Sequence, residues 1–166
     1  MTGVVKQINR SRGGLPKLPV EGVVRLTAGG IEGDWQSNRK HHGGPDKAIL
    51  MIAAEAVEEL AAQGYPVASG SLGENLTVSG MDRHNWRTGQ RYRVGDGCVI
   101  ELTTPRVPCL NLDSYGAGIK TELYDAACRA KDVTSPRWAN GGFYARVISE
   151  GFVFAGASIE LTEELA

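Results

Sequence analysis

The alternation of hydrophobic and polar positions predicts a chain built mostly of short strands separated by turns. The clearest pair covers residues 90–94 and 98–103, which are joined by a Gly-Asp-Gly segment typical of a hairpin. In the second strand Cys98, Ile100 and Leu102 share one face, so we expect Cys98 in the core. The same pattern predicts further strands at residues 3–9, 22–27, 76–79, 143–148 and 157–161, and a continuous apolar run predicts one at residues 48–53.

Two segments have the periodicity of an amphipathic helix. Residues 55–63 place their apolar side chains on one face, and Gly64 supplies a C-terminal stop. Residues 120–130 are predicted to form a second helix, with Cys128 bordering its apolar face as a small buried side chain. Short strands with two helices predict a mainly β fold, a closed or nearly closed β-barrel with a few flanking α-helices. We expect it to form a single domain over residues 1–166.

Composition narrows the class of protein. The chain has 166 residues, enough for a genuine core, and 18 Lys plus Arg against 19 Asp plus Glu leave a net charge of −1. This balance argues against nucleic acid or an anionic membrane as the main partner. Three cysteines without paired spacing argue against a disulfide scaffold. Because the chain has no long apolar run and no signal-peptide core, we expect a cytoplasmic protein.

The stretch Thr104–Cys109 carries the strongest signal for chemistry. Pro105 and Pro108 remove backbone donors and restrict φ, so we expect the preceding strand to end in a short, stiff loop. This loop presents the Cys109 thiol with the Arg106 guanidinium three residues upstream. A cation near a thiol favours the thiolate, which is both a nucleophile and a metal ligand. The alternative is a small apolar cysteine packed at the end of a loop.

A second group of polar residues lies between residues 33 and 47, where no periodicity is visible. Gly43 and Gly44 let backbone N–H groups approach a ligand closely, as in anion-binding concavities. Lys47 and His42 add positive charge or hydrogen-bond donors beside them. These features suit a phosphate group, and the alternative is a solvated basic turn. The Walker pattern of nucleotide-binding loops is missing.

Other uses of these residues stay open. The adjacent histidines could bind zinc, although no Cys-x-x-Cys or His-x-x-x-His spacing supports a closed site. Cys109, His42 and Asp34 could form a hydrolytic triad, although no nucleophile elbow accompanies them. Residues 73–75 have the composition of an ordinary turn, from which Asn75 could hydrogen-bond a polar ligand.

Five fragments together resemble the MOSC domain, which is named for the C-terminal part of molybdenum cofactor sulfurases. The resemblance is to the small stand-alone bacterial members, the YiiM-like group, and it covers residues 20–161. Each fragment is weak alone, but their order matches the family and makes the set fairly specific. The fragments are Gly33-Asp34, His42-Gly43-Gly44-Pro45-Asp46-Lys47-Ala48, Gly73-Glu74-Asn75-Leu76-Thr77-Val78, Pro105-Arg106-Val107-Pro108-Cys109 and Gly142-Phe143-Tyr144-Ala145-Arg146-Val147.

The resemblance implies a β-barrel in which Cys109 is the catalytic residue and either a molybdenum ligand or a sulfur carrier. A molybdenum cofactor (molybdopterin) would bind through the Cys109 thiolate, a soft ligand that suits molybdenum. Its terminal phosphate would need basic side chains and backbone donors. The residues expected to contact this cofactor are His42, Gly43, Gly44, Lys47, Asn75, Arg106 and Arg146.

Three functional expectations follow from the resemblance. The first is a reductase of N-hydroxylated purines or related N–O compounds. This chain lacks the ferredoxin-like cysteine set and flavin domain of larger relatives, so a separate electron-donor protein would be needed. The second is a sulfur carrier, in which Cys109 holds a persulfide received from a separate desulfurase. The third is a non-enzymatic cofactor-binding protein. Leu110 stands where stand-alone relatives often have Tyr or Phe.

Overall fold

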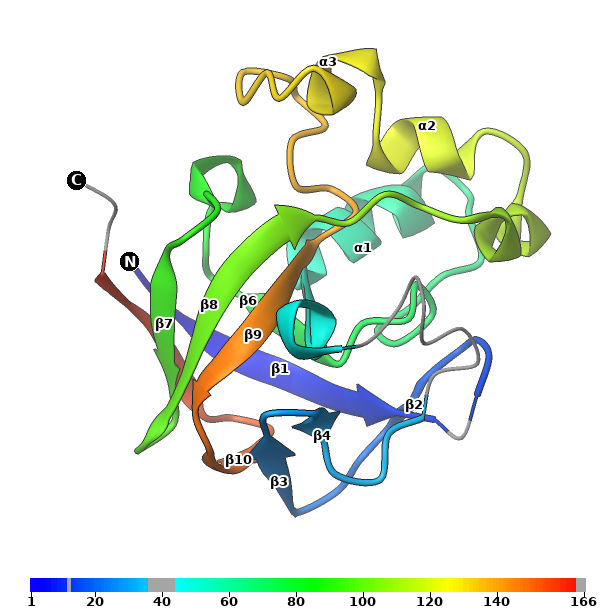
Figure 1. Ribbon diagram of the computed structural model, residues 1–166. Coiled ribbons are helices and arrows are strands. Elements are labelled where there is room, and N and C mark those ends of the chain that lie inside the picture. The colour runs from blue at the N-terminus through cyan, green and yellow to red at the C-terminus, as the bar shows by residue number, and fades with distance from the viewer. Residues whose placement is uncertain (12, 36–43, 164–166) are drawn as a thin grey trace.

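The computed structural model describes residues 1–11, 13–35 and 44–163 and confirms a mainly β fold. Figure 1 shows a barrel with the helices gathered at one end. The strands are β1 (Thr2–Arg10), β2 (Leu18–Pro19), β3 (Val23–Thr27), β4 (Gly30–Ile31), β5 (Ile49–Ala53), β6 (Leu76–Ser79), β7 (Arg91–Val94), β8 (Cys98–Pro105), β9 (Phe143–Ser149), β10 (Gly151–Phe154) and β11 (Ser158–Glu163). The α-helices are α1 (Ala54–Ala62), α2 (Ile119–Leu123) and α3 (Ala126–Arg129), and the 3-10 helices are η1 (Pro45–Lys47), η2 (Arg83–Asn85) and η3 (Leu110–Tyr115).

Seven of these strands close into the barrel. Hydrogen-bonded neighbours follow the order β1, β6, β5, β9, β8, β7 and β11, and β11 pairs back onto β1 with Ile159 opposite Gly3. The pairs in this ring are antiparallel, except that β5 and β6 are parallel. A parallel pair needs a crossover connection, which α1 provides between β5 and β6. Closure pairs the edges that an open sheet would expose.

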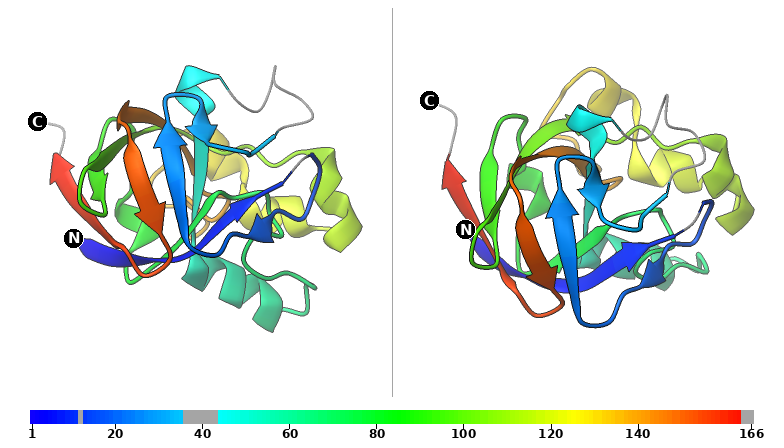
Figure 2. Two further views of the ribbon diagram at one scale, coloured as in Figure 1. Left: turned by 90° about the horizontal axis from the view of Figure 1, so that it is seen from below. Right: turned by 60° about the horizontal axis from the view of Figure 1, so that its bottom comes forward.

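A smaller sheet of β10, β3 and β4 lies at the end of the barrel away from the helices (Figures 1 and 2). Val24, Leu26 and Val153 are buried beneath it, whereas Val23 and Phe152 are exposed on its outer face. Of its strands only β3 is predicted by the hydrophobic pattern. β4 has two residues and β10 has four, too few for a periodic signal to stand out.

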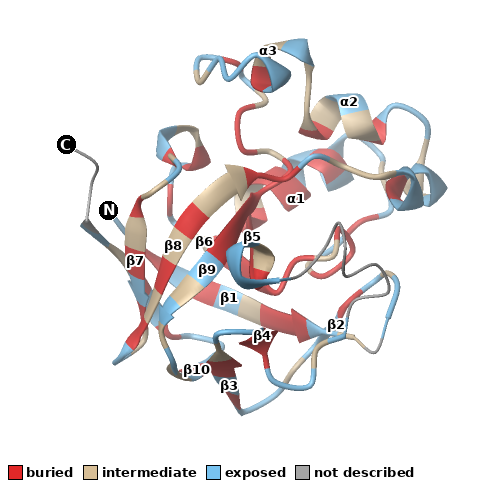
Figure 3. Cartoon of the chain, viewed as in Figure 1, coloured by how far each residue is buried: buried red, intermediate tan, exposed pale blue. Residues whose placement is uncertain are grey.

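The apolar interior runs through the strands, as the red segments of Figure 3 show. Cys98, Ile100 and Leu102 of β8 are fully buried, which confirms the predicted inward face of this strand. Phe143 at the start of β9 meets Trp86 and Trp138 edge-on, with ring centroids 6.4 and 5.9 Å away. This aromatic cluster packs the helical end of the barrel, where the loop after β8 leaves the sheet.

The single helix predicted over residues 120–130 is wrong. The structure has two short helices, α2 and α3, because Tyr124 between them adopts an extended conformation with φ −159° and ψ 109°. The Asp125 carboxylate then accepts a hydrogen bond from Cys128 N at 2.8 Å and caps α3. An aspartate at this position favours a helix start over a helix interior. Cys128 itself is buried, as expected.

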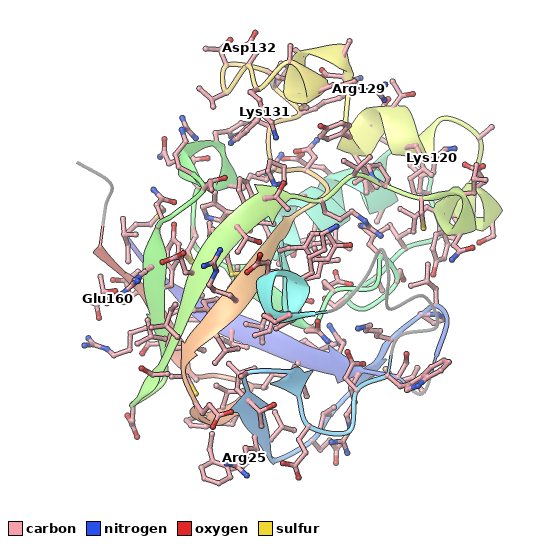
Figure 4. All side chains as sticks on the ribbon, in the orientation of Figure 1. Arg25, Lys120, Arg129, Lys131, Asp132 and Glu160 are labelled. Carbon is pink, nitrogen blue, oxygen red and sulfur yellow. The ribbon has the colours of Figure 1, made fainter. Side chains whose placement is uncertain are left out.

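Charged side chains of both signs lie mostly on the outside of the molecule. Figure 4 labels examples that project from several elements, namely Arg25, Lys120, Arg129, Lys131, Asp132 and Glu160. In the described ranges the buried charged residues are Lys17, Glu74, Arg83 and Arg106. Among the helices that the structure describes, none is long and apolar enough to cross a membrane.

Gly142 connects the start of β9 to the loop that follows β8, because its carbonyl accepts a hydrogen bond from Arg106 N at 2.9 Å. It has φ +87°, and an added Cβ would clash with Met51 O and the Ile52 side chain. We therefore predict that Gly142→Ala lowers the free energy of unfolding by about 2–4 kcal/mol, measured by urea denaturation.

Gly156 provides the matched control for this substitution. It also has positive φ, at +99°, but an added Cβ would meet nothing within 4 Å. Gly156→Ala should therefore cost only the backbone strain, about 1 kcal/mol. Equal losses in the two variants would show that the close approach to Met51 and Ile52 contributes nothing.

Candidate functional site

A cavity opens where six parts of the chain converge: the loop after β1, the segment after β4, strand β5, the loop before β6, the segment after β8, and strand β9. Arg106 and Cys109 both line it, so the cation and the thiol of the Pro-Arg-Val-Pro-Cys motif face the same cavity. The opposite walls come from segments that are distant in sequence. The full lining is Gly14, Leu15, Lys17, Trp35, Leu50, Leu72, Gly73, Arg106, Cys109, Asn111 and Tyr144.

Cys109 stands at the end of the stiff loop predicted from the sequence. Strand β8 continues through Pro105, which pairs with Phe143, and Arg106 N is then hydrogen-bonded to Gly142 O. Cys109 has an extended backbone and immediately precedes η3, so its side chain is set by a strand on one side and a helical turn on the other. It is partly buried, whereas Cys98 and Cys128 are fully buried. Cys109 is thus the thiol of this chain that reaches a cavity.

Arg106 is a buried cation whose hydrogen-bonding capacity is only partly used. Its Nη2 donates to Leu72 O at 2.8 Å, and the residue is 3% exposed. Nε and Nη1 have no hydrogen-bond partner among the described residues. Buried donors without acceptors cost free energy, so native proteins rarely leave them unpaired without a role. A guanidinium that lines a cavity with free donors can bind an anion there.

Glu74 lies behind the cavity wall and is fully buried. Neither carboxylate oxygen accepts a hydrogen bond of favourable geometry in the described structure. Burial raises the pKa of Glu74 to about 7, while the nearby Arg106 and the amides of residues 70, 72 and 74 act in the opposite direction. Sequence reasoning missed this residue, because an acidic residue between Gly73 and Asn75 has the composition of a surface turn.

Lys17 and Asp34 form a buried ion pair at the cavity, with Nζ and Oδ2 2.6 Å apart and both side chains under 10% exposed at 7% and 6%. The Asp34 carboxylate also accepts from Ser11 N and from Asn75 Nδ2, each at 2.9 Å. The pair is therefore well satisfied, and it holds the Lys17 side chain at the cavity wall. In the described structure this use of Asp34 supports packing rather than the hydrolytic triad considered from sequence.

Asn75 was expected to contact a ligand, and its side chain is instead engaged within the protein. It is fully buried, its Oδ1 accepts from Leu50 N at 3.1 Å, and its Nδ2 also donates to Asn9 O at 3.3 Å. These bonds join β5, β1 and the loop that carries Asp34. Asn75 thus positions the cavity wall from behind, and its direct contact with a cofactor stays a prediction.

The loop predicted to bind phosphate is described only from Gly44 onward. Gly44 has φ 82° and precedes η1, and Lys47 Nζ lies 5.1 Å from the ring centroid of Tyr144. Since Tyr144 lines the cavity, this end of the loop lies beside the site of Cys109. His42 and Gly43 lie outside the described residues, and so do both histidines of the zinc hypothesis. Their expected contacts therefore stay predictions.

Tyr144 was not singled out from the sequence, although it follows Phe143 in one of the family fragments. Its pKa is raised by burial and by the nearby Cys109, and lowered somewhat by Arg106. The three side chains therefore lie within electrostatic reach of one another. Alternation along the strand places Tyr144 on the outer face of β9, and this residue is nevertheless buried, because other parts of the chain, η1 among them, pack against β9.

Arg146 lies on the same outer face of β9, two residues further along. Its guanidinium pairs with Asp46 Oδ1 at 3.3 Å and Glu101 Oε1 at 3.6 Å, and its side chain is 44% exposed. It does not line the cavity. In the described structure Arg146 ties η1 to the barrel, and its expected contact with the cofactor stays a prediction.

Glu74 should make stability depend on pH. Its pKa is about 7 in the folded protein against an ordinary value of 4.5, so the folded state keeps a proton that the unfolded chain has already released. The stabilisation of the folded state that comes from this raised pKa is fully present below about pH 4.5 and is lost as pH rises through 7. We predict that Glu74→Gln, which keeps the shape and removes the charge, is more stable than wild type by up to about 3 kcal/mol at pH 8.

Denaturation curves between about pH 5 and 8 test this dependence. The control is Glu58→Gln, since Glu58 is exposed and pairs with Lys6 on the surface. Wild type and Glu58→Gln should lose stability in parallel as pH rises, and Glu74→Gln should lose less. Parallel curves for all three proteins would show that Glu74 ionises normally.

Comparison with known proteins identifies the family of this fold. A family model described as MOSC domain matches residues 38–160. The chain is 34% identical to YflK of Bacillus subtilis (strain 168) over 151 residues, which are 89% of this chain and 62% of that protein. It is 30% identical to YiiM of Escherichia coli (strain K12) over 156 residues, covering 92% of this chain and 65% of that protein. The chain therefore spans less than two thirds of the length of both relatives.

Two further likenesses agree with this result. A protein named Reductase from Gibberella moniliformis is 27% identical over 150 residues, covering 86% of this chain and 24% of that protein. The crystal structure of YiiM from Geobacillus stearothermophilus superposes with a TM-score of 0.72 at 26% identity, covering 97% of this chain and 75% of that chain. The matched family model takes in β5 to β10 and the whole Cys109 loop. The chain belongs to the MOSC domain family.

Proposed function

We propose that this chain binds molybdenum cofactor in the cavity beside Cys109 and reduces N-hydroxylated purines or related N–O compounds. Electrons would come from a separate donor protein. The observation that carries the proposal is the pairing, in one cavity, of a partly buried thiol with a buried guanidinium that has two unused donors. A soft ligand and an anion-binding cation are the two things that this cofactor requires of its protein.

The residues of the cavity fit the cofactor in their chemistry. The Cys109 thiolate would bind the metal, and the Arg106 guanidinium, whose Nε and Nη1 lack acceptors, would pair with the phosphate. Lys17 adds a second cation at the wall. Lys47, which lies beside Tyr144, adds a further cation next to the cavity, and we propose that Gly44, Gly43 and His42 supply further contacts to the cofactor.

When bound, such a cofactor supplies two-electron chemistry with oxygen-atom transfer, and the protein supplies binding and orientation. Leu15, Leu50 and Leu72 give the cavity an apolar wall that would exclude water from the reacting groups. Trp35, 42% exposed, offers a flat surface on which a planar base could stack at the mouth. The name of the Gibberella moniliformis relative, Reductase, favours this class of reaction over a purely structural role.

Metal content tests the proposal directly. Protein prepared from cells that make the cofactor should contain molybdenum, and Cys109→Ser should lose nearly all of it, because a hydroxyl is a poor ligand for this metal. Cys128→Ala is the control: it also removes a thiol, but one buried away from the cavity, and it should keep the metal. Metal-free wild-type protein from such cells, or Cys109→Ser that keeps its molybdenum, would contradict the proposal.

The same preparations separate the reductase from its alternatives. Loaded wild type with a chemical electron donor should convert an N-hydroxylated purine to the parent purine, and Cys109→Ser should not. A sulfur carrier would instead gain the mass of one sulfur on Cys109 after incubation with a desulfurase, and reductant would remove it; the accessibility of this thiol is what favours that alternative. A non-enzymatic cofactor-binding protein would hold molybdenum without turnover.

A further inference from the structure

Arg106 lines the cavity and Glu74 lies behind its wall; the two residues can carry opposite charges, and no hydrogen bond joins them. The guanidinium uses only Nη2, toward Leu72 O, and both oxygens of the carboxylate lack a well-placed donor in the described structure. Both residues are at least 97% buried, with 3% and 0% exposed. A buried polar pair left partly unsatisfied on both sides is unusual and points to a third participant.

The two residues differ in their access to that participant. Arg106 lines the cavity together with Leu72 and Gly73, whereas Glu74, the next residue along the chain, does not line it. An anion in the cavity therefore faces the Arg106 side of this pair and has no contact with the carboxylate. Glu74 can respond to the anion only through charge, because it has no contact with it.

The surroundings of Glu74 leave few ways to balance its charge. Arg106, from the loop after β8, is the cation that acts on it, and the amides of residues 70, 72 and 74 add partial positive charge. From η3 the Tyr115 hydroxyl donates to Ser71 O at 2.7 Å, and the pKa of Tyr115 is raised by its own burial and by Glu74. Tyr115 offers no positive charge, so ionised Glu74 is stabilised first by its own backbone amide, next by Arg106, and then by the amides of residues 70 and 72.

We propose that Glu74 takes up one proton from solvent when an anion binds Arg106 in the cavity. An anion on the guanidinium cancels the positive potential that Arg106 supplies to the carboxylate. The buried carboxylate then has no cation to balance it, and protonation removes the unfavourable charge. In the balanced step, the ionised Glu74, the Arg106 guanidinium, a free anion and a proton give the neutral acid and a guanidinium–anion pair.

This linkage makes the cavity select its ligand by charge and pH. Proton binding at Glu74 and anion binding at Arg106 strengthen each other by the same factor. Above the pH at which Glu74 ionises in the free protein, the affinity for a dianion should therefore fall by up to about tenfold per pH unit. A neutral or zwitterionic ligand would show no such dependence. Where the anion is the phosphate of a cofactor, the inference rests on the proposed function; the linkage itself concerns any oxyanion at Arg106.

Calorimetric titration with sulfate tests the linkage, because sulfate stays a dianion over the whole range from about pH 6 to 8.5 and does not titrate itself. Repeating each titration in buffers of different ionisation enthalpy measures the protons taken up per sulfate bound. We expect uptake that approaches one proton near pH 8 and affinity that falls as pH rises. Arg106→Gln should lose sulfate binding at every pH, since it removes the charge that holds the anion.

Glu74→Gln should bind sulfate without proton uptake and with affinity independent of pH. Glu58→Gln, which removes an exposed carboxylate, should behave as wild type. Should Glu74→Gln fail to fold, infrared spectra of wild type at pH 8 give the same information, because sulfate should produce the C=O band of a protonated carboxylic acid. Absence of sulfate binding, binding without proton uptake, or uptake that persists in Glu74→Gln would each overturn the inference.

The outcomes distinguish this inference from the proposed function. Proton-linked sulfate binding in a protein that never acquires molybdenum would leave the linkage standing and refute the cofactor proposal. Molybdenum retained through Cys109 in a protein whose sulfate binding takes up no proton would refute the linkage alone. The two experiments use different ligands and different variants, so neither failure can be mistaken for the other.

Discussion

The pairing of β8 with β9 is the constraint on which the candidate site depends. The ladder ends with Pro105 opposite Phe143, and the next hydrogen bond joins Arg106 N to Gly142 O. Because proline cannot donate further, the chain leaves the sheet there and directs Arg106 and Cys109 into the cavity. The same ladder places Tyr144 opposite Thr104, so the loop and the strand that face each other across the site are set by one register.

Two groups of buried charge at this cavity are treated very differently by the fold. Lys17 and Asp34 are in contact, and Ser11 and Asn75 complete the hydrogen bonds of the carboxylate. Arg106 and Glu74 are equally buried, yet each keeps unpaired atoms. The hydrogen bonds of the first pair hold the loops in place. In the second pair several donors and acceptors stay without a protein partner, which lowers stability and is the pattern expected of groups that bind a ligand or a proton.

The contrast between the two pairs shows how one small barrel can hold its loops in place and still carry a buried group that can change its ionisation. Barrel closure through β1 and β11 fixes the strands, and loops from distant parts of the chain then meet at the helical end. The thiol of Cys109 needs only that frame and its stiff loop. The Arg106 guanidinium keeps its charge, whereas Glu74 beside it, with a pKa of about 7, can change its ionisation near neutral pH.

Much of the barrel and one half of the site follow from the sequence by itself. Period-two alternation identifies β1, β3, β6 to β9 and β11, and a continuous apolar run identifies β5. The alternation also buries Cys98, and two prolines define the loop that presents Arg106 and Cys109. These are local properties, decided by neighbours along the chain. The break between α2 and α3 escaped the same reasoning, because the capping tendency of Asp125 competes with an apolar period and wins.

Only the tertiary structure decided which other side chains line the cavity or lie directly behind its wall. Lys17, Glu74 and Tyr144 come from segments whose local patterns indicate a turn, a turn and an outer strand face, and packing against distant elements buries all three. Asn75 illustrates the converse, since a residue expected to meet a ligand is enclosed by β1 and β5. Burial is a property of the assembled barrel, and burial is what turns an ordinary glutamate into a group that titrates near neutral pH.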